Sequence, residues 1–315
     1  MSKTPDRQQG NQNPRLAQVK REVLFFRAIT KLNDGKLVPF LYEKTVDCIR
    51  AKPKNNRYMW FDKNRMLCEP QPVVRDQLLF YLTKMGNLPE IEDLGGVSPL
   101  DLSETAGLAK RTHIRFFPDN VVGVMRSSGS PLAQQVSRYL ETQCASEKIP
   151  FHGIFPLVDC DRKALIRRAD HFKRLELKLD LTLLGQPTLV EEQKGPFATA
   201  LEGFARNLRS QSVRLVLETP DAPGVKEFLL EMCGINTVSK SLLSLNAKAA
   251  DDEDNAYQIS FFDNQVKTEV KVLKESERGD AVQSFDAFAK ISDAYEKVKN
   301  KLKEAVCLEL EPKKG

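Results

Sequence analysis

The residues of this 315-residue chain that could carry chemistry are mostly basic. The largest group spans a predicted helix from residue 162 and the strand that follows it, and its members are Arg162, Lys163, Arg167, Arg168, Lys173, Arg174 and Lys178. Arg174 and Lys178 are an even number of residues apart, so they share the strand face opposite the alternating leucines of residues 175–181. Several cations on one surface are enough to bind phosphates, because binding releases condensed counterions.

Two smaller basic groups flank this one along the chain. One enters a predicted hairpin and consists of Lys110, Arg111, His113 and Arg115. The other has Arg206 and Arg209 at helical spacing and Arg214 in the strand that follows. We expect at least one of the three groups to contact nucleic acid, and the alternative is ordinary solvated surface.

One constellation suggests catalysis. Asp180, followed about a dozen residues later by Glu192 and Lys194, has the spacing of the PD-(D/E)xK nucleases, in which two carboxylates hold a metal and the lysine helps to activate water. Gly185 and Pro187 interrupt the intervening chain, however, which favours a solvated loop. The sequence has no Walker motif, nucleophile elbow or H-E-x-x-H motif, so we assign no catalytic residue.

Cysteine and histidine give no metal or cofactor site. The six cysteines form no C-x-x-C pair and the three histidines are scattered, so we expect free thiols, no zinc and no cofactor. The aromatic group around Trp60, with Tyr58 and Phe61, could stack on bases, but its alternation favours a place in the core.

Charge is unevenly distributed along the chain. Residues 105–215 carry 17 basic against 11 acidic residues, whereas residues 216–315 carry 14 against 19, within a net charge of +5. This asymmetry indicates an anionic partner for the middle of the chain. No apolar run is long enough to cross a membrane and the polar first residues are no secretion signal, so we expect a cytoplasmic protein without membrane insertion.

The pattern of elements predicts an α+β fold with antiparallel hairpins, a mixed sheet, packed helices and a long C-terminal helix. Strands are expected within 23–49 around a turn at 33–35, and at 57–61, 113–117, 121–126, 175–181, 213–219, 257–262 and 266–273. Helices are expected at 76–84, 131–147 with Ser130 as N-cap, 162–171, 196–211, 223–232, 238–249 and 284–306.

These elements suggest four regions. They are a disordered arm at 1–18, a β-rich region at 19–104 that ends in a long connection from residue 86, a central basic α+β domain at 105–250, and a C-terminal hairpin with its long helix at 251–315 after an acidic linker. The apolar stripe of the last helix fits equally well against its own sheet or against a second subunit.

Three stretches of this layout resemble the RexA family of phage-exclusion proteins of lambdoid phages. They are RFFPDNVVGVMRSSGSPLAQQVSRYL (115–140), FHGIFPLVDCDRKALIRRADHFKRLELKLD (151–180) and YQISFFDNQVKTEVKVLKESERGD (257–280) with the long terminal helix. The resemblance covers about the last two-thirds of the chain and brings no catalytic residues.

The resemblance implies a homodimeric protein that binds DNA without sequence preference and activates a partner effector during phage infection. We therefore expect a DNA-binding protein of antiviral defence, acting in abortive infection. A metal-dependent nuclease in the same setting and a non-catalytic dimeric adaptor are the alternatives.

Overall fold

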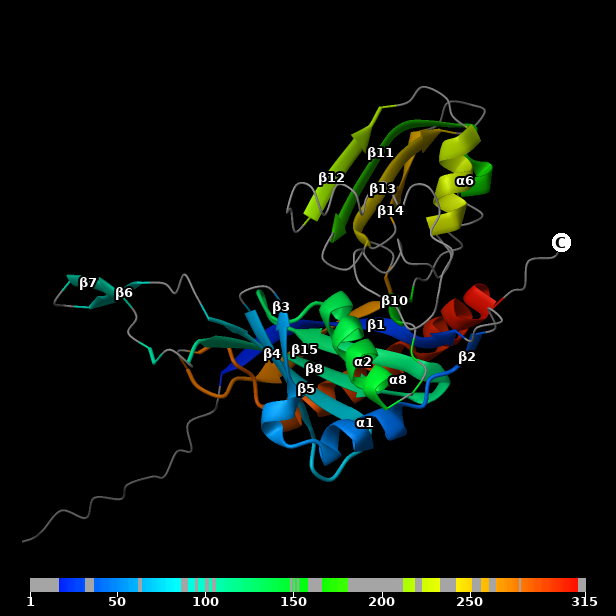
Figure 1. Cartoon of the computed structure of the whole chain (residues 1–315). Helices are drawn as coiled ribbons and strands as arrows, with labels where there is room; N and C mark the ends of the chain where they lie inside the picture. Colours follow the sequence, from blue (N-terminus) through cyan, green and yellow to red (C-terminus); the bar gives the residue numbers. More distant parts are fainter. Residues whose placement is uncertain are drawn as a thin grey trace, which may run out of the picture.

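The chain folds as an α+β protein built on two antiparallel sheets and a small hairpin (Figure 1). In this computed structural model the described residues are 17–31, 37–61, 64–85, 90–93, 96–99, 102–103, 106–147, 149, 151, 153–157, 166–180, 212–218, 223–232, 242–250, 256–260, 265–277 and 279–310. The predicted fold class is confirmed.

The first sheet has nine strands in the order β10-β1-β9-β8-β5-β4-β3, with β2 and β15 also paired to β1. The bounds are β1 Gln18–Lys31, β2 Leu37–Pro39, β3 Tyr58–Phe61, β4 Asn64–Pro70, β5 Gln77–Lys84, β8 Leu108–Phe116, β9 Val121–Arg126, β10 Gly153–Pro156 and β15 Lys267–Leu273. A separate hairpin joins β6 (Glu90–Asp93) and β7 (Gly96–Pro99).

Strand β1 organises this sheet because it has neighbours along both edges. Its residues 18–24 pair with β15 and residues 26–29 pair with β10 along one edge. Along the other edge, residues 23–27 pair with β9 and residues 29–31 pair with β2. A strand in this position is covered on both faces, which explains its continuous apolar run Val23-Leu24-Phe25-Phe26.

Helices cover both faces of the first sheet. On one face, α1 (Tyr42–Ala51) and α2 (Ala133–Ser146) bury residues such as Ile49 and Tyr139 against Phe26, Phe80 and Ile114. On the other face, α8 (Ser284–Leu310) buries Phe288, Ile291 and Tyr295 against Val23 and Phe25. The long terminal helix therefore packs against its own sheet, one of the two arrangements that the sequence allowed.

The second sheet lies within the chain segment between β10 and β15, which we call the inserted segment (158–264). It has the order β12-β11-β13-β14, with β11 His171–Asp180, β12 Ser212–Leu217, β13 Leu242–Ala250 and β14 Ala256–Ser260. Helix α6 (Pro223–Met232) lies beside it, and the sheet stands apart from the first one (Figure 1). Strand pairing therefore crosses the predicted region boundaries at 104/105 and 250/251.

The two ends of the inserted segment meet at Phe25. The amide of Val266 donates to the carbonyl of Leu157 at 2.8 Å, and the amide of Leu157 donates to the carbonyl of Phe25 at 3.0 Å. The amide of Phe25 in turn donates to the carbonyl of Val266 at 3.0 Å, and the side-chain amide of Gln265 reaches the Phe25 carbonyl at 2.9 Å. The chain thus leaves and re-enters the first sheet at one point.

Two predicted helices are strands. Residues 77–84 form β5, in which Leu78, Leu79 and Phe80 are all buried because β5 lies between β4 and β8 with helices on both sides. Such a continuous apolar run cannot be distinguished from a helix by periodicity. Residues 242–250 form β13, where pairing with β11 and β14 overrides the helical preference of an alanine-rich run.

Other local predictions also need correction. Residues 42–49 belong to helix α1, with Thr45, Val46 and Ile49 buried at helical spacing, and the connection after residue 86 contains the β6–β7 hairpin. The predicted hairpin of 257–273 is wrong, because β14 pairs with β13 whereas β15 pairs with β1. Gln18 already belongs to β1 and not to a disordered arm.

The beginnings of two helices differ from the predicted ones. Helix α2 begins after Leu132, and Ser130 instead accepts a hydrogen bond from Thr112 at 3.0 Å. The predicted helix 162–171 is helical over 166–168 in its described part, and His171 begins β11. The turn at 33–35, the helix at 196–211 and the acidic linker at 251–254 lie outside the described residues.

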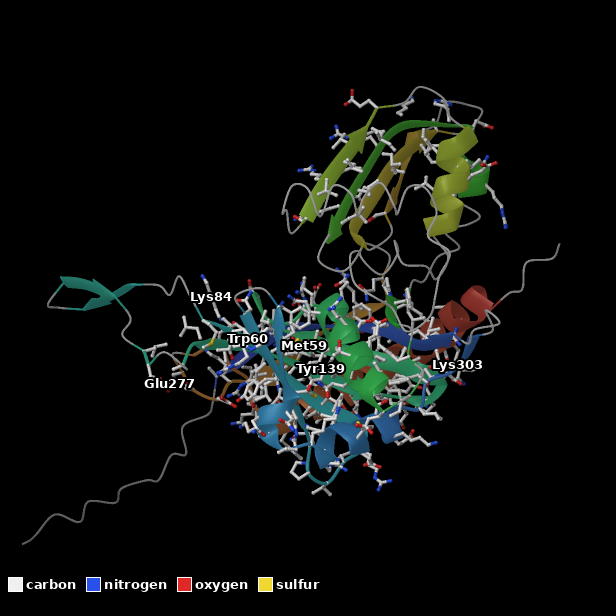
Figure 2. The ribbon with its side chains drawn as sticks, viewed as in Figure 1. Met59, Trp60, Lys84, Tyr139, Glu277 and Lys303 are labelled. Carbon is white, nitrogen blue, oxygen red and sulfur yellow. The ribbon has the colours of Figure 1, made fainter. Side chains whose placement is uncertain are left out.

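The predicted hairpin of residues 113–126, the strands at 58–61 and 212–217 and the helix at 223–232 are confirmed. Trp60 is not in the core, however. Its side chain is exposed on edge strand β3 (Figure 2), whereas its neighbours Met59 and Phe61 pack partly against the α1–α2 side of the core.

Replacing Gly123 with alanine should destabilise the first sheet by about 1–3 kcal/mol, because a core this tightly packed does not accept an extra carbon without strain. A Cβ at this position would lie 2.6 Å from Cγ2 of Ile291 on α8 and 3.1 Å from the ring of Phe117. Gly224→Ala in α6 is the control, since its Cβ would meet nothing within 4 Å. Urea unfolding of both variants measures the difference, and equal stability would contradict the packing described for α8.

Replacing residues 159–263 with a short Gly-Ser linker should leave the first sheet folded. The reason is that the two flanking chains are already hydrogen-bonded to each other, so the linker has almost no distance to span. Circular dichroism and a cooperative thermal melt of the shortened chain measure this. A shortened chain that purifies without a cooperative melt would show that the first sheet depends on the inserted segment.

Candidate nucleic-acid interface

The strongest concentration of charge at described positions is on the outer face of the second sheet. Strict alternation in β11 buries Leu175, Leu177 and Leu179 on the inner face, as the sequence predicts. The opposite face carries cations from three adjacent strands. We call this set the basic sheet face: Arg174 and Lys178 on β11, Arg214 on β12 and Lys248 on β13.

A β-bulge sets the register of this face. Phe172 pairs with Ala249 and Arg174 pairs with Lys248, so Lys173 is the extra residue of β11. Phe172 is therefore buried on the inner face although it is an even number of residues from Arg174. The bulge leaves Lys173, which sequence spacing alone did not place, exposed at the end of the face.

Like charges lie directly opposite each other across the strands of this face. Arg174 is opposite Lys248, and Lys178 is opposite Arg214. Like-charged pairs at directly opposite positions destabilise a sheet. Two such pairs lie side by side on this face, and both are positive.

One carboxylate lies between these pairs. Glu176 accepts from Arg214 at 2.7 Å and from Arg174 at 3.4 Å, and the exposed Glu218 is 3.9 Å from Arg174. Lys178 and Lys248 have no ionic partner within the part of the chain that the structure describes. The face therefore keeps an excess of positive charge, which water or an anion must screen.

The outer part of β1, where it pairs with β15, also has like charges at directly opposite positions, but their sign alternates along the strands. Lys20 is opposite Lys271 and Glu22 is opposite Glu269, so Glu269 lies 2.9 Å from Lys20 and Glu22 lies 3.2 Å from Lys267 along the diagonals. Both carboxylates of this surface, which we call the balanced β1–β15 surface, therefore meet a lysine on the neighbouring strand. On the basic sheet face both opposed pairs are positive, and this diagonal compensation is incomplete.

Arg167 and Arg168 are not on the basic sheet face. They belong to the helical turn 166–168, and the neighbouring carbonyl of Ala169 accepts from Lys226 of α6 at 2.8 Å. Helix α6 lies beside the sheet (Figure 1), and its Leu229 is buried. The cluster expected from the sequence is thus divided, and Arg214 and Lys248 take the place of these two arginines.

The predicted group on β8 is largely neutralised within the fold. Arg111 forms an ion pair with Glu275, and Arg115 donates to Asp76 at 2.9 Å and also to Ser292 of α8. Lys110 is exposed and has no ionic partner at any described position. Arg111 and Arg115 therefore join β8 to neighbouring segments through pairs with acidic residues of the chain itself.

His113 is buried beneath the beginning of α8. Its Nε2 atom is 3.0 Å from the hydroxyl of Ser284, and its ring meets Phe288 edge-on at 5.2 Å. Burial, with Arg111 nearby, lowers the pKa of His113 from 6.5 to about 4, so the imidazole is neutral at physiological pH. The residue joins the sheet to α8 and is not part of a nucleic-acid surface.

Several predicted site residues lie outside the described residues. They are Arg162, Lys163, Arg206, Arg209, Glu192 and Lys194. Asp180 is the last residue of β11, opposite Ser212, and only its backbone is described. Within the described ranges no three His, Cys, Asp or Glu side chains are grouped as a metal site, and Cys48, Cys68 and Cys144 are free thiols.

Sequence reasoning missed Lys248. It lies in a run that was predicted as a helix, yet Ser244, Asn246 and Lys248 alternate there with buried Ala247 and Ala249. That polar–small alternation was the available signal for a half-buried strand. It was weak because alanine favours helices.

No profile of a known protein family matches the chain, and no curated protein matches it either. Among its described helices, none has the combination of length and apolarity that crossing a bilayer demands. The geometry of the basic sheet face is therefore the basis for assigning a function to the chain.

The burial of His113 predicts a specific loss of stability in acid. In the unfolded chain His113 is protonated below pH 6.5, whereas in the folded chain it is protonated only below about pH 4. As the pH falls through this window, the free energy of unfolding should therefore decrease by on the order of 3 kcal/mol. His113→Gln should remove this contribution and flatten the curve between pH 4 and 6.5. Urea unfolding at several pH values tests this, and parallel curves for the two proteins would rule it out.

Proposed function

We propose that the chain binds DNA without sequence preference through the basic sheet face. The observation that carries the proposal is the presence of two opposed pairs of cations side by side, with Glu176 between them and Glu218 near Arg174 as their acidic partners at described positions. Such an arrangement costs folding free energy and is relieved when an anion approaches. Four cations spread over three neighbouring strands match a polyanion better than a single small ion.

The chemistry of the face favours phosphates over bases. Beside the four cations, the other side chains described on this face of β12 and β13 are those of serine, valine, glutamate and asparagine, none of which has a ring on which a base could stack. His171 of β11 lies beyond the bulge, at the end of the face. Lysine and arginine on a sheet contact the backbone of a duplex irrespective of its sequence. Duplex DNA is therefore the preferred ligand in this proposal.

The biological setting is proposed from the resemblance to phage-exclusion proteins. In this setting the chain is a cytoplasmic homodimer of an antiviral abortive-infection system, which binds DNA and activates a partner effector. The catalytic step then belongs to the effector and not to this chain. An adaptor that dimerises through the apolar stripe of α8 is less favoured, because Phe288, Ile291, Tyr295 and Leu302 of that stripe are buried against the chain's own sheet and only Phe285 at its beginning is exposed among the described members.

Replacing Lys178, Arg214 and Lys248 with glutamine should weaken duplex binding and make it less dependent on salt. Each lost phosphate contact should lower the slope of log affinity against log salt by about one unit. A matched control replaces Lys20, Lys267 and Lys271, which removes the same charge from the balanced β1–β15 surface. Gel shifts at several salt concentrations, with and without magnesium, measure both variants, and thermal melts verify folding.

If both triple variants lose the same duplex affinity, the loss comes from the lower net charge of the chain and not from a particular surface. That outcome would contradict the assigned site. Cleavage of the duplex in magnesium would overturn the non-catalytic part of the proposal.

Glu176→Gln supplies a test in the opposite direction. It leaves the cations in place and removes the carboxylate between them, so duplex affinity should rise while thermal stability falls.

A further inference from the structure

A basic cavity lies in the first sheet, away from the basic sheet face. It has a volume of about 270 Å³, and its lining includes Arg21 of β1, Lys110 and Arg111 of β8, and Arg126 of β9. His113 and Tyr81 also contribute to the lining. Helix α8 covers this sheet face only from Ser284 onward. Residues 279–282 of the preceding loop, which is described at 274–277 and 279–283, line the cavity there and form its roof.

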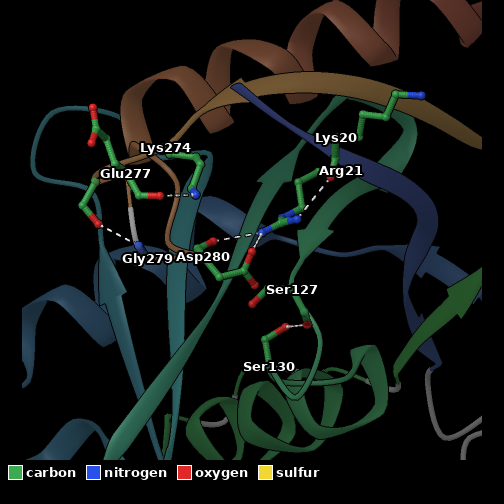
Figure 3. Close-up of polar contacts among 9 residues, drawn as sticks. Lys20, Arg21, Ser127, Ser130, Lys274, Glu277, Gly279 and Asp280 are labelled. Atoms are coloured by element: carbon green, nitrogen blue, oxygen red, sulfur yellow. Dashed lines mark hydrogen bonds and ion pairs between the residues drawn. The ribbon is translucent and has the colours of Figure 1, made fainter. Parts of the chain in front are cut away.

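The roof is an ordered loop whose base is closed by backbone contacts. Lys274 and Val282 form an antiparallel bridge, and the amide of Glu275 donates to the carbonyl of Ala281 at 2.9 Å. Within the tip, the amide of Gly279 donates to the hydroxyl of Ser276 at 3.0 Å, as Figure 3 shows. These contacts hold Asp280 in the wall of the cavity and Glu275 at the base of the loop.

Two carboxylates of this loop neutralise two arginines of the sheet. Arg21 donates to both the side chain and the main-chain carbonyl of Asp280, the latter at 2.9 Å (Figure 3), and Arg111 donates to Glu275. The side chain of Arg21 is only 13% exposed, whereas that of Asp280 is 50% exposed. The cations are thus fixed in the sheet, and the anions that balance them sit in solvent-accessible positions.

The charge of the cavity is not balanced by these pairs. Lys110 and Arg126 have no ionic partner among the residues with a described structure, and Asp280 is the one acidic residue in the lining. Guanidinium groups bind phosphate through paired N–H donors, and phosphate carries more charge than a carboxylate. An exposed carboxylate ion pair contributes little stability, so a phosphate can replace it at small cost.

We propose that this cavity binds the phosphate group of a small molecule, with Arg21 and Arg111 as its principal ligands and Asp280 and Glu275 as the internal anions that the phosphate displaces. The volume is near the lower end of small-molecule sites, which are roughly 300–1,000 Å³, so a ligand no larger than a mononucleotide is indicated. The half-buried Tyr81 ring, 5.6 Å from the Arg111 guanidinium, gives one wall an aromatic surface. This site is independent of the proposed DNA-binding face.

Calorimetric titration of the full chain with inorganic phosphate and with adenosine monophosphate, at constant ionic strength, tests the proposal. Arg21→Gln and Arg111→Gln should each weaken phosphate binding at least tenfold, since each removes a charged ligand. Asp280→Asn should strengthen it several-fold, because the internal competitor is gone. Lys20→Gln, next to Arg21 but paired with Glu269 on the balanced β1–β15 surface, should bind like the unaltered chain.

Two arginine variants are needed because loss of the Arg21–Asp280 contact also loosens the loop. Circular dichroism of each establishes that a weak titration comes from a folded protein. The triple variant of Lys178, Arg214 and Lys248 should keep full phosphate affinity, which separates this site from the DNA-binding face. No heat with either probe, undiminished binding in both arginine variants, or weaker binding in Asp280→Asn would overturn the proposal.

Discussion

The hydrogen-bonded junction around Phe25 is the contact on which the rest of this architecture depends. Phe25 uses its backbone amide and carbonyl to join Leu157, where the chain leaves the first sheet, to Val266, where it returns. The same residue buries its side chain completely against α8. One strand position thus closes the base of the inserted segment and anchors the core on the α8 face.

Because the base of the inserted segment is closed in this way, the two sheets have separate cores and different polar surfaces. The first sheet covers its apolar faces with α1, α2 and α8, and the carboxylates on the β1–β15 surface each pair diagonally with a lysine. The second sheet has helix α6 beside it and an outer face on which both opposed pairs are positive. The contrast between the two polar surfaces, one balanced and one not, is the physical basis for assigning an anionic partner to the inserted segment.

Secondary structure could be predicted from the sequence where one face of an element is exposed to solvent, and was predicted wrongly where both faces are buried. The leucines of β11 alternate with charged residues, so their strand and the sides of Arg174 and Lys178 could be predicted. In β5 the apolar residues are consecutive, and in β13 small residues replace large ones, so neither pattern has a clear period. The opposition of Arg174 to Lys248 could not be foreseen, because it depends on pairing between strands about 70 residues apart and on a bulge at Lys173.

The order of β1, β15 and α8 along the chain has a consequence for synthesis on the ribosome. Val23 and Phe25 leave the ribosome long before Ser284, where the helix that covers them begins. Until then one apolar face of the growing first sheet has no cover, and the edge of β1 that β15 will occupy has unpaired backbone groups. Contacts between such distant segments form slowly, and exposed edges of this kind attract other chains. The nascent protein therefore passes through a long interval in which half of its core is open, and this interval ends only when the last helix docks.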